Sequence, residues 1–248
     1  MSGLARSYEK AIRKELSSHA AWLPITNTLK IGDYGYFEGG VFRSIGNIMN
    51  KYPDITLDIV EGPTAKIDFT SAGTKTFKLN ANGEVTDSFA ALGDAEASLN
   101  FEFTKENSVI IKVDEIGVNQ LQNIEEVAMG LASKSGWKKK YKIISATYTG
   151  KDCLIICARE ANSTFKISAS ADLLKAVESG KVDVGFETSS SNSSIFNSIG
   201  ESGVIALRMF KLNWFGNLKL LADDQLANKV SIEKIFGIDM EKDLEDDF

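Results

Sequence analysis

The chain is poor in the side chains that most often carry out catalysis and metal binding. It has a single histidine, His19, among 248 residues. One histidine cannot build a metal site with several histidines, and it supplies at most one member of a catalytic triad. We expect His19 to lie at the end of the first helix, either solvated or interacting with the helix dipole.

Cysteine is almost as scarce, with only Cys153 and Cys157. Both lie in residues 152–158 (DCLIICA), which read as one strand. Four residues along a strand span roughly 13 Å, whereas a disulfide needs Cα atoms within about 7 Å. We therefore expect two unpaired thiols that pack as small apolar groups in a reducing compartment.

Sequence motifs of enzymes are also missing. The chain contains no CxxC, phosphate loop, GxSxG or kinase signature. The glycines of residues 32–46 do not fit the dinucleotide spacing, and they read as turns around a small hairpin at residues 34–42. Paired acids such as Asp114 and Glu115 are typical of solvated faces. We expect no enzymatic activity, no cofactor and no metal.

Long apolar runs are absent as well. No stretch approaches 18 consecutive apolar residues, and the N-terminus lacks the apolar region of a signal peptide. The sequence predicts a cytoplasmic chain without a transmembrane helix, and it leaves open a later insertion as amphipathic strands. An isoelectric point near 5.0 argues against broad nucleic-acid binding.

All of the net charge lies at the C-terminus. Residues 223–248 hold nine acidic and three basic side chains, which equals the net charge of −6 of the whole chain. We divide the chain into a body, residues 1–220, and an acidic tail, residues 221–248. The tail carries an apolar stripe that we expect to anchor it to the body: Ile232, Ile235, Phe236 and Ile238. The connection at residues 218–229 offers cleavage sites to a protease at Lys219, Asp223, Asp224 and Lys229.

The body alternates apolar and polar residues with a period of two, which predicts strands through most of residues 55–214. One interior helix is predicted at residues 118–133. Strands are predicted at residues 141–148, 153–158, 164–170 and 182–188, followed by a serine-rich connection at 189–194. Residues 173–178 are either a helical turn or the tip of a long hairpin. The resulting fold class is α+β, a twisted, mainly antiparallel sheet with a few peripheral helices.

Two groups of basic residues have alternative interpretations. An amphipathic helix at the N-terminus carries Arg6, Lys10 and Arg13, and it either packs on the body or lies on a membrane surface. A lysine run comprises Lys138, Lys139 and Lys140 between Trp137 and Tyr141. That run is either an ordinary charged entrance to a strand or a contact for anionic lipid or for the acidic tail.

Four segments resemble, in order, parts of the bacterial gasdermins, which are pore-forming proteins of cell-suicide defence. They are residues 97–113 (ASLNFEFTKENSVIIKV), 140–160 (KYKIISATYTGKDCLIICARE), 164–188 and 204–214 (VIALRMFKLNW). The resemblance covers roughly residues 55–215 and implies a fold like the gasdermin N-terminal domain. The chain departs from the family in having no cysteine in residues 1–20 for acylation, and residues 32–46 have no place in the family pattern.

The resemblance implies a latent protein that serves in anti-phage defence and is autoinhibited by its tail. A companion protease would release it to oligomerise and to insert amphipathic hairpins into the inner membrane. The apolar face of one such hairpin would comprise Phe165, Ile167, Val182, Val184 and Phe186. The alternative is a soluble, non-enzymatic interaction module whose acidic tail docks a partner. The acidic tip, residues 243–248, also resembles the ends of single-stranded-DNA-binding proteins, although the body lacks their basic and aromatic groove.

Overall fold

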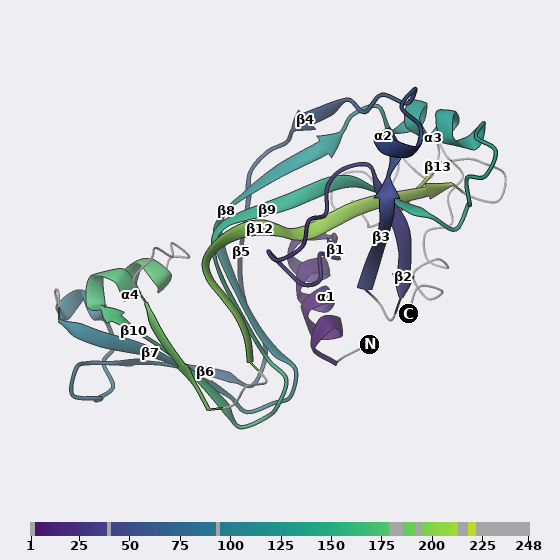
Figure 1. The fold of residues 1–248 in the computed structure, drawn as a ribbon. Helices are drawn as coiled ribbons and strands as arrows, with labels where there is room; N and C mark the ends of the chain where they lie inside the picture. The colour runs from purple at the N-terminus through teal and green to yellow at the C-terminus, as the bar shows by residue number, and fades with distance from the viewer. Residues whose placement is uncertain are drawn as a thin grey trace, which may run out of the picture.

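The computed structural model describes residues 3–38, 41–92, 95–178, 186–191, 195–212 and 218–221. Within these ranges, antiparallel strands make up most of the protein, and four helices lie around them (Figure 1). The expected α+β class, with a mainly antiparallel sheet and a few helices, is confirmed.

The helices are α1 (Gly3–Leu16), α2 (Ile48–Lys51), α3 (Ile124–Ala132) and α4 (Ala171–Glu178), together with the 3₁₀ turn η1 (Phe89–Ala91). The strands are β1 (His19–Ala20), β2 (Asp33–Glu38), β3 (Val41–Asn47), β4 (Ile59–Glu61), β5 (Ala65–Thr70), β6 (Thr74–Leu79), β7 (Glu96–Phe103), β8 (Ser108–Leu121), β9 (Lys142–Ala158), β10 (Ser163–Ser170), β11 (Glu187–Ser190), β12 (Ile195–Leu212) and β13 (Leu218–Leu221).

Three long antiparallel strands, β8, β9 and β12, form the centre of the larger sheet. They are 14, 17 and 18 residues long, and they curve together from the end near α3 towards the smaller sheet (Figure 1). Register shifts in the pairing of β12 with β9 accompany this curvature, as bulges commonly do. Strands β4 and β5 pair with β8, β1 and β13 pair with β12, and the hairpin β2–β3 pairs with the start of β9.

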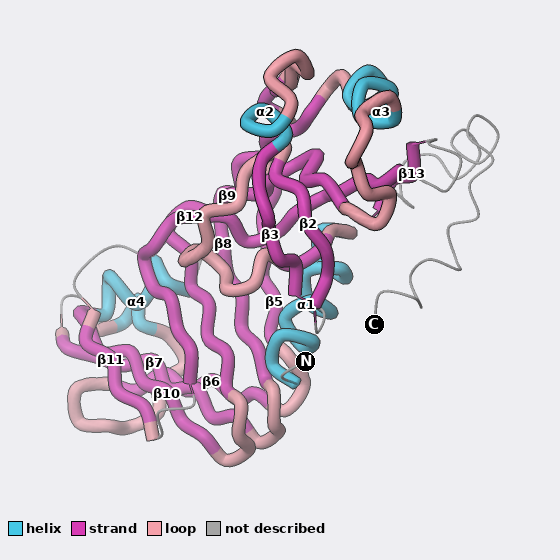
Figure 2. Tube along the Cα trace, turned by 45° about the vertical axis from the view of Figure 1, so that its right-hand side comes forward, coloured by secondary structure: helices cyan, strands magenta, loops and turns pink. Residues whose placement is uncertain are grey.

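The smaller sheet has the strand order β11-β10-β7-β6. Its connections to the larger sheet include two tight four-residue turns, from β7 to β8 through residues 104–107 and from β9 to β10 through residues 159–162 (Figure 2). Each connection contains an asparagine with positive φ, 54° at Asn107 and 57° at Asn162. Asparagine tolerates this conformation better than most residues, so these turns suit their sequence.

The central strands are covered on both faces. Val109 and Ile111 of β8 belong to one hydrophobic cluster, whereas Ile110 between them belongs to another. The same alternation in β9 places Cys153, Ile155 and Cys157 on the first face and Leu154, Ile156 and Ala158 on the second. Burial on both sides accounts for the uninterrupted apolar sequence here. Both cysteines are buried and free, as expected.

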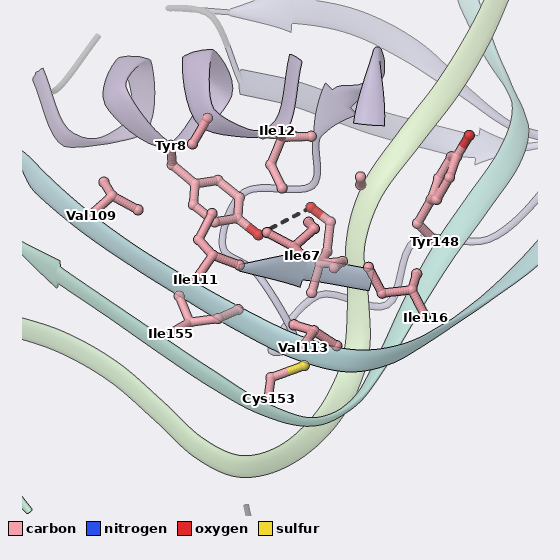
Figure 3. Packing of buried hydrophobic residues seen from close by; sticks show 14 of the residues in the cluster. Tyr8, Ile12, Ile67, Val109, Ile111, Val113, Ile116, Tyr148, Cys153 and Ile155 are labelled. Carbon is pink, nitrogen blue, oxygen red and sulfur yellow. Dashed lines mark hydrogen bonds between the residues drawn. The ribbon is translucent and has the colours of Figure 1, made fainter. Parts of the chain in front are cut away.

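Helix α1 covers the first face of these strands. Leu4, Tyr8 and Ile12 recur every four residues, so they share the side of the helix that packs against the sheet (Figure 3). The hydroxyl of Tyr8 donates a hydrogen bond to the carbonyl of Ile205 at 3.2 Å. Burial, together with the neighbouring thiols, raises the pKa of Tyr8 well above its usual value. The phenol therefore remains protonated and keeps this bond.

A buried carboxylate joins α1 to β1. Glu9 accepts hydrogen bonds from Nε of Arg13 at 2.6 Å and from the backbone N–H of Ala20 at 2.5 Å, and Nδ1 of His19 lies 3.1 Å away. Burial alone would raise the pKa of Glu9, but the hydrogen bond and charge of His19, the charge of Arg13 and the N–H of Ala20 outweigh it, and the pKa falls. The expectation of a solvated His19 is wrong, because this contact holds it at 2% exposure.

We expect Glu9→Gln to lower the free energy of unfolding by about 2–4 kcal/mol at pH 7, because Arg13 loses its charged partner and the N–H of Ala20 loses a charged acceptor in a buried site. The folded-state pKa of Glu9 is depressed, so its contribution is present above the unfolded value of 4.5 and is lost as the pH falls through the folded value. Urea titrations from pH 7 to pH 3 should show a shallower acid loss in the variant. Glu15→Gln on the exposed side of α1 is the control, and an equal effect there would contradict the assignment.

One helix prediction is wrong in its first half. Residues 118–121, expected to be helical, form the end of β8, and residues 118–120 pair with residues 146–148 of β9. The helix begins only at Ile124, after Asn123, and its buried side is Val127, Ala128 and Leu131. The apolar residues before Asn123 fit both periodicities, and pairing with a long neighbouring strand decides in favour of β structure.

Other expectations can be compared directly with the structure. The hairpin at residues 34–42 is confirmed as β2–β3, where Gly35 is required because a Cβ there would lie 1.8 Å from the carbonyl oxygen of Arg43. Residues 187–190, expected partly as a connection, form the edge strand β11. The two strands expected at residues 141–148 and 153–158 are one continuous strand, β9.

Candidate functional site

The smaller sheet is amphipathic, with its two faces set by the strand register. Across β7 and β10, Phe101 pairs with Phe165 and Leu99 pairs with Ile167, and all four side chains are at most 3% exposed. They point towards the larger sheet, where they meet the second face of β8 and β9. The alternate positions face outwards and are polar, and they include Asn100, Glu102, Lys166 and Ser168.

The outward face is also hollowed. A shallow cavity of about 390 Å³ lies on it, with Glu96, Ser98, Lys166, Ser168 and Glu187 among its lining residues. These side chains come from β7, β10 and β11, and Asn80, Ala81 and Gly83 after β6 complete the lining, so the hollow lies towards the end of the sheet where β7 begins and β10 ends. The sheet thus presents water on one side and apolar side chains on the other, which is the alternation typical of a half-buried antiparallel sheet.

Helix α4 covers the end of the apolar face. Its buried side chains Ala171, Leu174 and Val177 pack in the same cluster as Phe165 and Ile167. The helix follows β10 without any connecting residue, and its position over the smaller sheet is visible in Figure 1. An ion pair between Glu178 of α4 and Lys78 of β6 adds a polar contact at the edge. This helix of eight residues therefore separates the end of the apolar face from solvent.

The alternation of β10 continues into the helix at the level of sequence. From Ser163 to Leu173, every second residue after Ser163 is apolar, namely Phe165, Ile167, Ala169, Ala171 and Leu173, while the residues between them are polar. Residues 94–104 show the same pattern, with Ala95, Ala97, Leu99, Phe101 and Phe103 separated by polar residues. Each run has eleven residues, whereas β7 and β10 have eight. This alternation can be read from the sequence, and it extends each of the two strand segments to eleven residues.

The predicted hairpin face is only partly described. Phe165 and Ile167 are buried in the cluster that includes side chains of β8, β9 and α4, and Phe186 is half-buried beside the same cluster. Val182 and Val184 lie outside the described residues. The described members thus share one face in the folded chain, and that face is turned inwards.

The predicted basic residues do not form one patch. Arg6 and Lys10 are exposed on α1, whereas Arg13 is held by its ion pair with Glu9. Lys138, Lys139 and Lys140 are exposed in the loop between α3 and β9. Helix α1 and the region of α3 lie apart in both views (Figures 1 and 2), so the two groups are separate surfaces.

The expected cleavage region begins in a strand. Lys219 lies in β13, opposite Lys211 of β12, and it is half-buried. A paired strand is a poor protease substrate, so the accessible part of the connection cannot start at residue 218 as expected. The other predicted cleavage residues, Asp223, Asp224 and Lys229, lie outside the described residues. So do the tail anchors Ile232, Ile235, Phe236 and Ile238.

The described part of the chain offers no constellation for metal chemistry. Within it, no three His, Cys, Asp or Glu side chains are placed to hold a metal ion. Burial raises the pKa of Cys153 to about 12, assisted by Asp152 and Glu201, so this thiol is a poor nucleophile. No helix within the described ranges is both long enough and apolar enough to cross a membrane.

No family profile and no curated protein matches this sequence. Among solved structures, the chain is similar to a bacterial gasdermin from Bradyrhizobium tropiciagri, with 11% identity and a TM-score of 0.39 over 87% of this chain and 90% of that one. It is also similar to Gasdermin A3 in its membrane pore, with 7% identity and a TM-score of 0.36 over 92% and 96% of the two chains. Both of these structures are gasdermins, which is the family named by the resemblance found in the sequence.

Proposed function

We propose that the chain is a latent pore-forming protein whose smaller sheet refolds into membrane-inserted hairpins. The observation that carries this proposal is the amphipathic sheet of β6, β7, β10 and β11, whose apolar face is covered at one end by the short helix α4. Two of its strands lie within eleven-residue alternating runs. A strand that crosses a bilayer needs about 9–11 residues, so these runs have the required length.

The proposed transition exchanges the partners of the two faces. The apolar face now packed on β8 and β9 turns to lipid, and the polar face with Lys166 and Ser168 turns to an aqueous lumen. Residues 171–173 leave α4 and extend β10. Because every backbone hydrogen bond must be satisfied in hydrocarbon, the hairpins of neighbouring copies must pair side by side. Oligomerisation and insertion are then a single coupled process.

The same proposal assigns the acidic tail an inhibitory role. Residues 223–248 hold the chain's whole net charge, and an anionic membrane surface repels that charge. We propose that a companion protease cleaves after residue 221, releasing a cytoplasmic latent chain to act on the inner membrane in anti-phage defence. The proposal gives the chain no catalytic step of its own and no nucleic-acid ligand.

Adjacent residues of β10 allow a matched test. Ala169 and Ser168 are both half-buried, lie near the middle of the alternating run and point to opposite faces. An arginine on the lipid side costs about 2–4 kcal/mol near the bilayer midplane, whereas one on the lumen side costs little. We expect Ala169→Arg to suppress dye release from liposomes by the activated protein, and Ser168→Arg to preserve it.

Thermal melts of both variants establish that the soluble fold is retained. Equal leakage by folded Ala169→Arg and Ser168→Arg proteins would refute the assignment of this face to lipid. No leakage from the activated parent chain would refute pore formation itself and would favour a soluble interaction module with a docking tail.

A further inference from the structure

Four aromatic rings surround one lysine at the end of the molecule opposite the smaller sheet. The rings are Tyr34 of β2, Tyr52 directly after α2, and Trp137 and Tyr141 of the loop between α3 and β9. The ammonium Nζ of Lys51 lies 5.1 Å from the centroid of Tyr34, 5.4 Å from Tyr52, 5.9 Å from Trp137 and 5.8 Å from Tyr141. All four distances fall within the range of cation–π attraction. We call these four rings the aromatic cage.

The rings form the walls of a cage and do not stack. The plane of Tyr34 is tilted by 57° against Trp137 and by 51° against Tyr141, and Trp137 meets Tyr141 at 76° and Tyr52 at 60°. Tyr34 and Tyr141 are only 6% and 8% exposed, because they belong to the hydrophobic cluster under α3. The cage is therefore held in place by the core and does not depend on Lys51 for its shape.

The loop that supplies two of the walls is also fixed locally. The backbone N–H of Trp137 donates to the carbonyl of Lys134 at 3.3 Å, and that of Tyr141 donates to the carbonyl of Lys138 at 2.9 Å. The buried indole Nε1 of Trp137 has no hydrogen-bond partner among the described residues. A buried donor without an acceptor is unfavourable for stability, so packing alone is a weak explanation for a tryptophan at this position.

Lys51 occupies the cage without the support of an ion pair to a described residue. It is the last residue of a four-residue helix, its side chain is exposed, and it makes no ion pair with any residue in the described ranges. The neighbouring carboxylate of Asp54 is engaged by Lys134 instead. A primary ammonium is strongly hydrated, and it loses that hydration between aromatic rings. A cation with weaker hydration would contact the same rings at a lower desolvation cost.

We propose that the aromatic cage binds the quaternary ammonium of a phosphocholine group in exchange for Lys51. Quaternary ammonium groups are characteristic ligands of aromatic cages. The displaced Lys51 then becomes available to the phosphate of the ligand, and the exposed Lys138, Lys139 and Lys140 follow Trp137 in the same loop. This proposal concerns the intact chain and does not depend on pore formation.

Calorimetric titration of the full chain with phosphocholine, choline and phosphoethanolamine tests the exchange. We expect binding in the order phosphocholine, choline, phosphoethanolamine, since the last carries a hydrated primary ammonium. Lys51→Ala empties the cage and should bind choline about tenfold more tightly than the parent chain, as expected for the loss of a competing cation worth one to two cation–π contacts. Tyr52→Leu should abolish this gain when combined with Lys51→Ala.

Tyr36→Leu is the matched control, because Tyr36 is an exposed tyrosine of the same hairpin that is not part of the cage. A folded Lys51→Ala protein without improved choline binding would overturn the proposal, as would an equal loss from Tyr36→Leu and Tyr52→Leu. Tighter binding of a trimethyl-lysine peptide than of phosphocholine would also overturn it. Retention on phosphatidylcholine but not phosphatidylethanolamine vesicles supports a lipid source, and binding of free phosphocholine without such retention supports a soluble ester.

Discussion

Site-specific cleavage between residues 222 and 229 should convert an inert chain into one that releases the contents of anionic liposomes. A cut directly after Ala222 removes residues 223–248 and with them a charge of −6, which leaves a body with no net charge. Close to an anionic leaflet each elementary charge is worth about 1 kcal/mol, so the membrane would no longer repel the chain. A recognition sequence for a selective protease, inserted into the full chain, allows activation in the presence of liposomes, and dye release reports the outcome.

Two controls define what this experiment measures. A scrambled insert of the same length should remain uncut and inert. An uncut chain with Ile232, Ile235, Phe236 and Ile238 all replaced by serine should leak partially if these residues anchor the tail. Complete cleavage without leakage would contradict the inhibitory role of the tail.

Phe101→Ala should cause a large loss of stability in the smaller sheet. The ring is 1% exposed and packs among the side chains of β7, β10 and the larger sheet. Removing a fully buried phenylalanine costs about 3–5 kcal/mol, because the transfer free energy is lost and a cavity remains. Denaturant titration measures this change directly.

Phe77→Ala provides the comparison for that variant. Phe77 lies in β6 of the same sheet, opposite Asn100 on the outward face, and is half-buried. Its removal should cost clearly less than that of Phe101. A similar loss from both variants would mean that the two faces of the sheet are not packed differently.

The sequence predicted strands better than their grouping into sheets. The alternation of apolar and polar residues correctly predicted β5, β7, β8, β9 and β10, because any strand with one buried face shows this pattern. It could not show that β7 and β10 leave the larger sheet and form a second one, since that depends on the turns at residues 104–107 and 159–162. The start of α3 was missed because Val118 and Leu121 fit both a helix stripe and a strand.

The candidate site was predicted in part for the same reason. Phe165 and Ile167 were identified from their alternation alone, but the helix that covers them was read only as a helical turn or the tip of a hairpin. Residues 171–178 satisfy a helical stripe through Ala171, Leu174 and Val177, and their first three residues also continue the strand pattern. Local sequence cannot decide between two such conformations when packing on a neighbouring sheet makes the difference. The aromatic cage could not be predicted from the sequence, because its four rings come from three segments that are far apart in the chain.

The division of apolar side chains between the two faces of β8 and β9 has a thermodynamic consequence. Helix α1 and strand β5 bury Val109, Ile111 and Ile155 on the first face. The smaller sheet and α4 bury Ile110 and Ile156 on the second face. If the smaller sheet detached, water would reach Ile110 and Ile156 on the second face, whereas the side chains of the first face would remain buried. The molecule therefore has two units of cooperativity built on shared strands, so that one can open while the other retains the native topology.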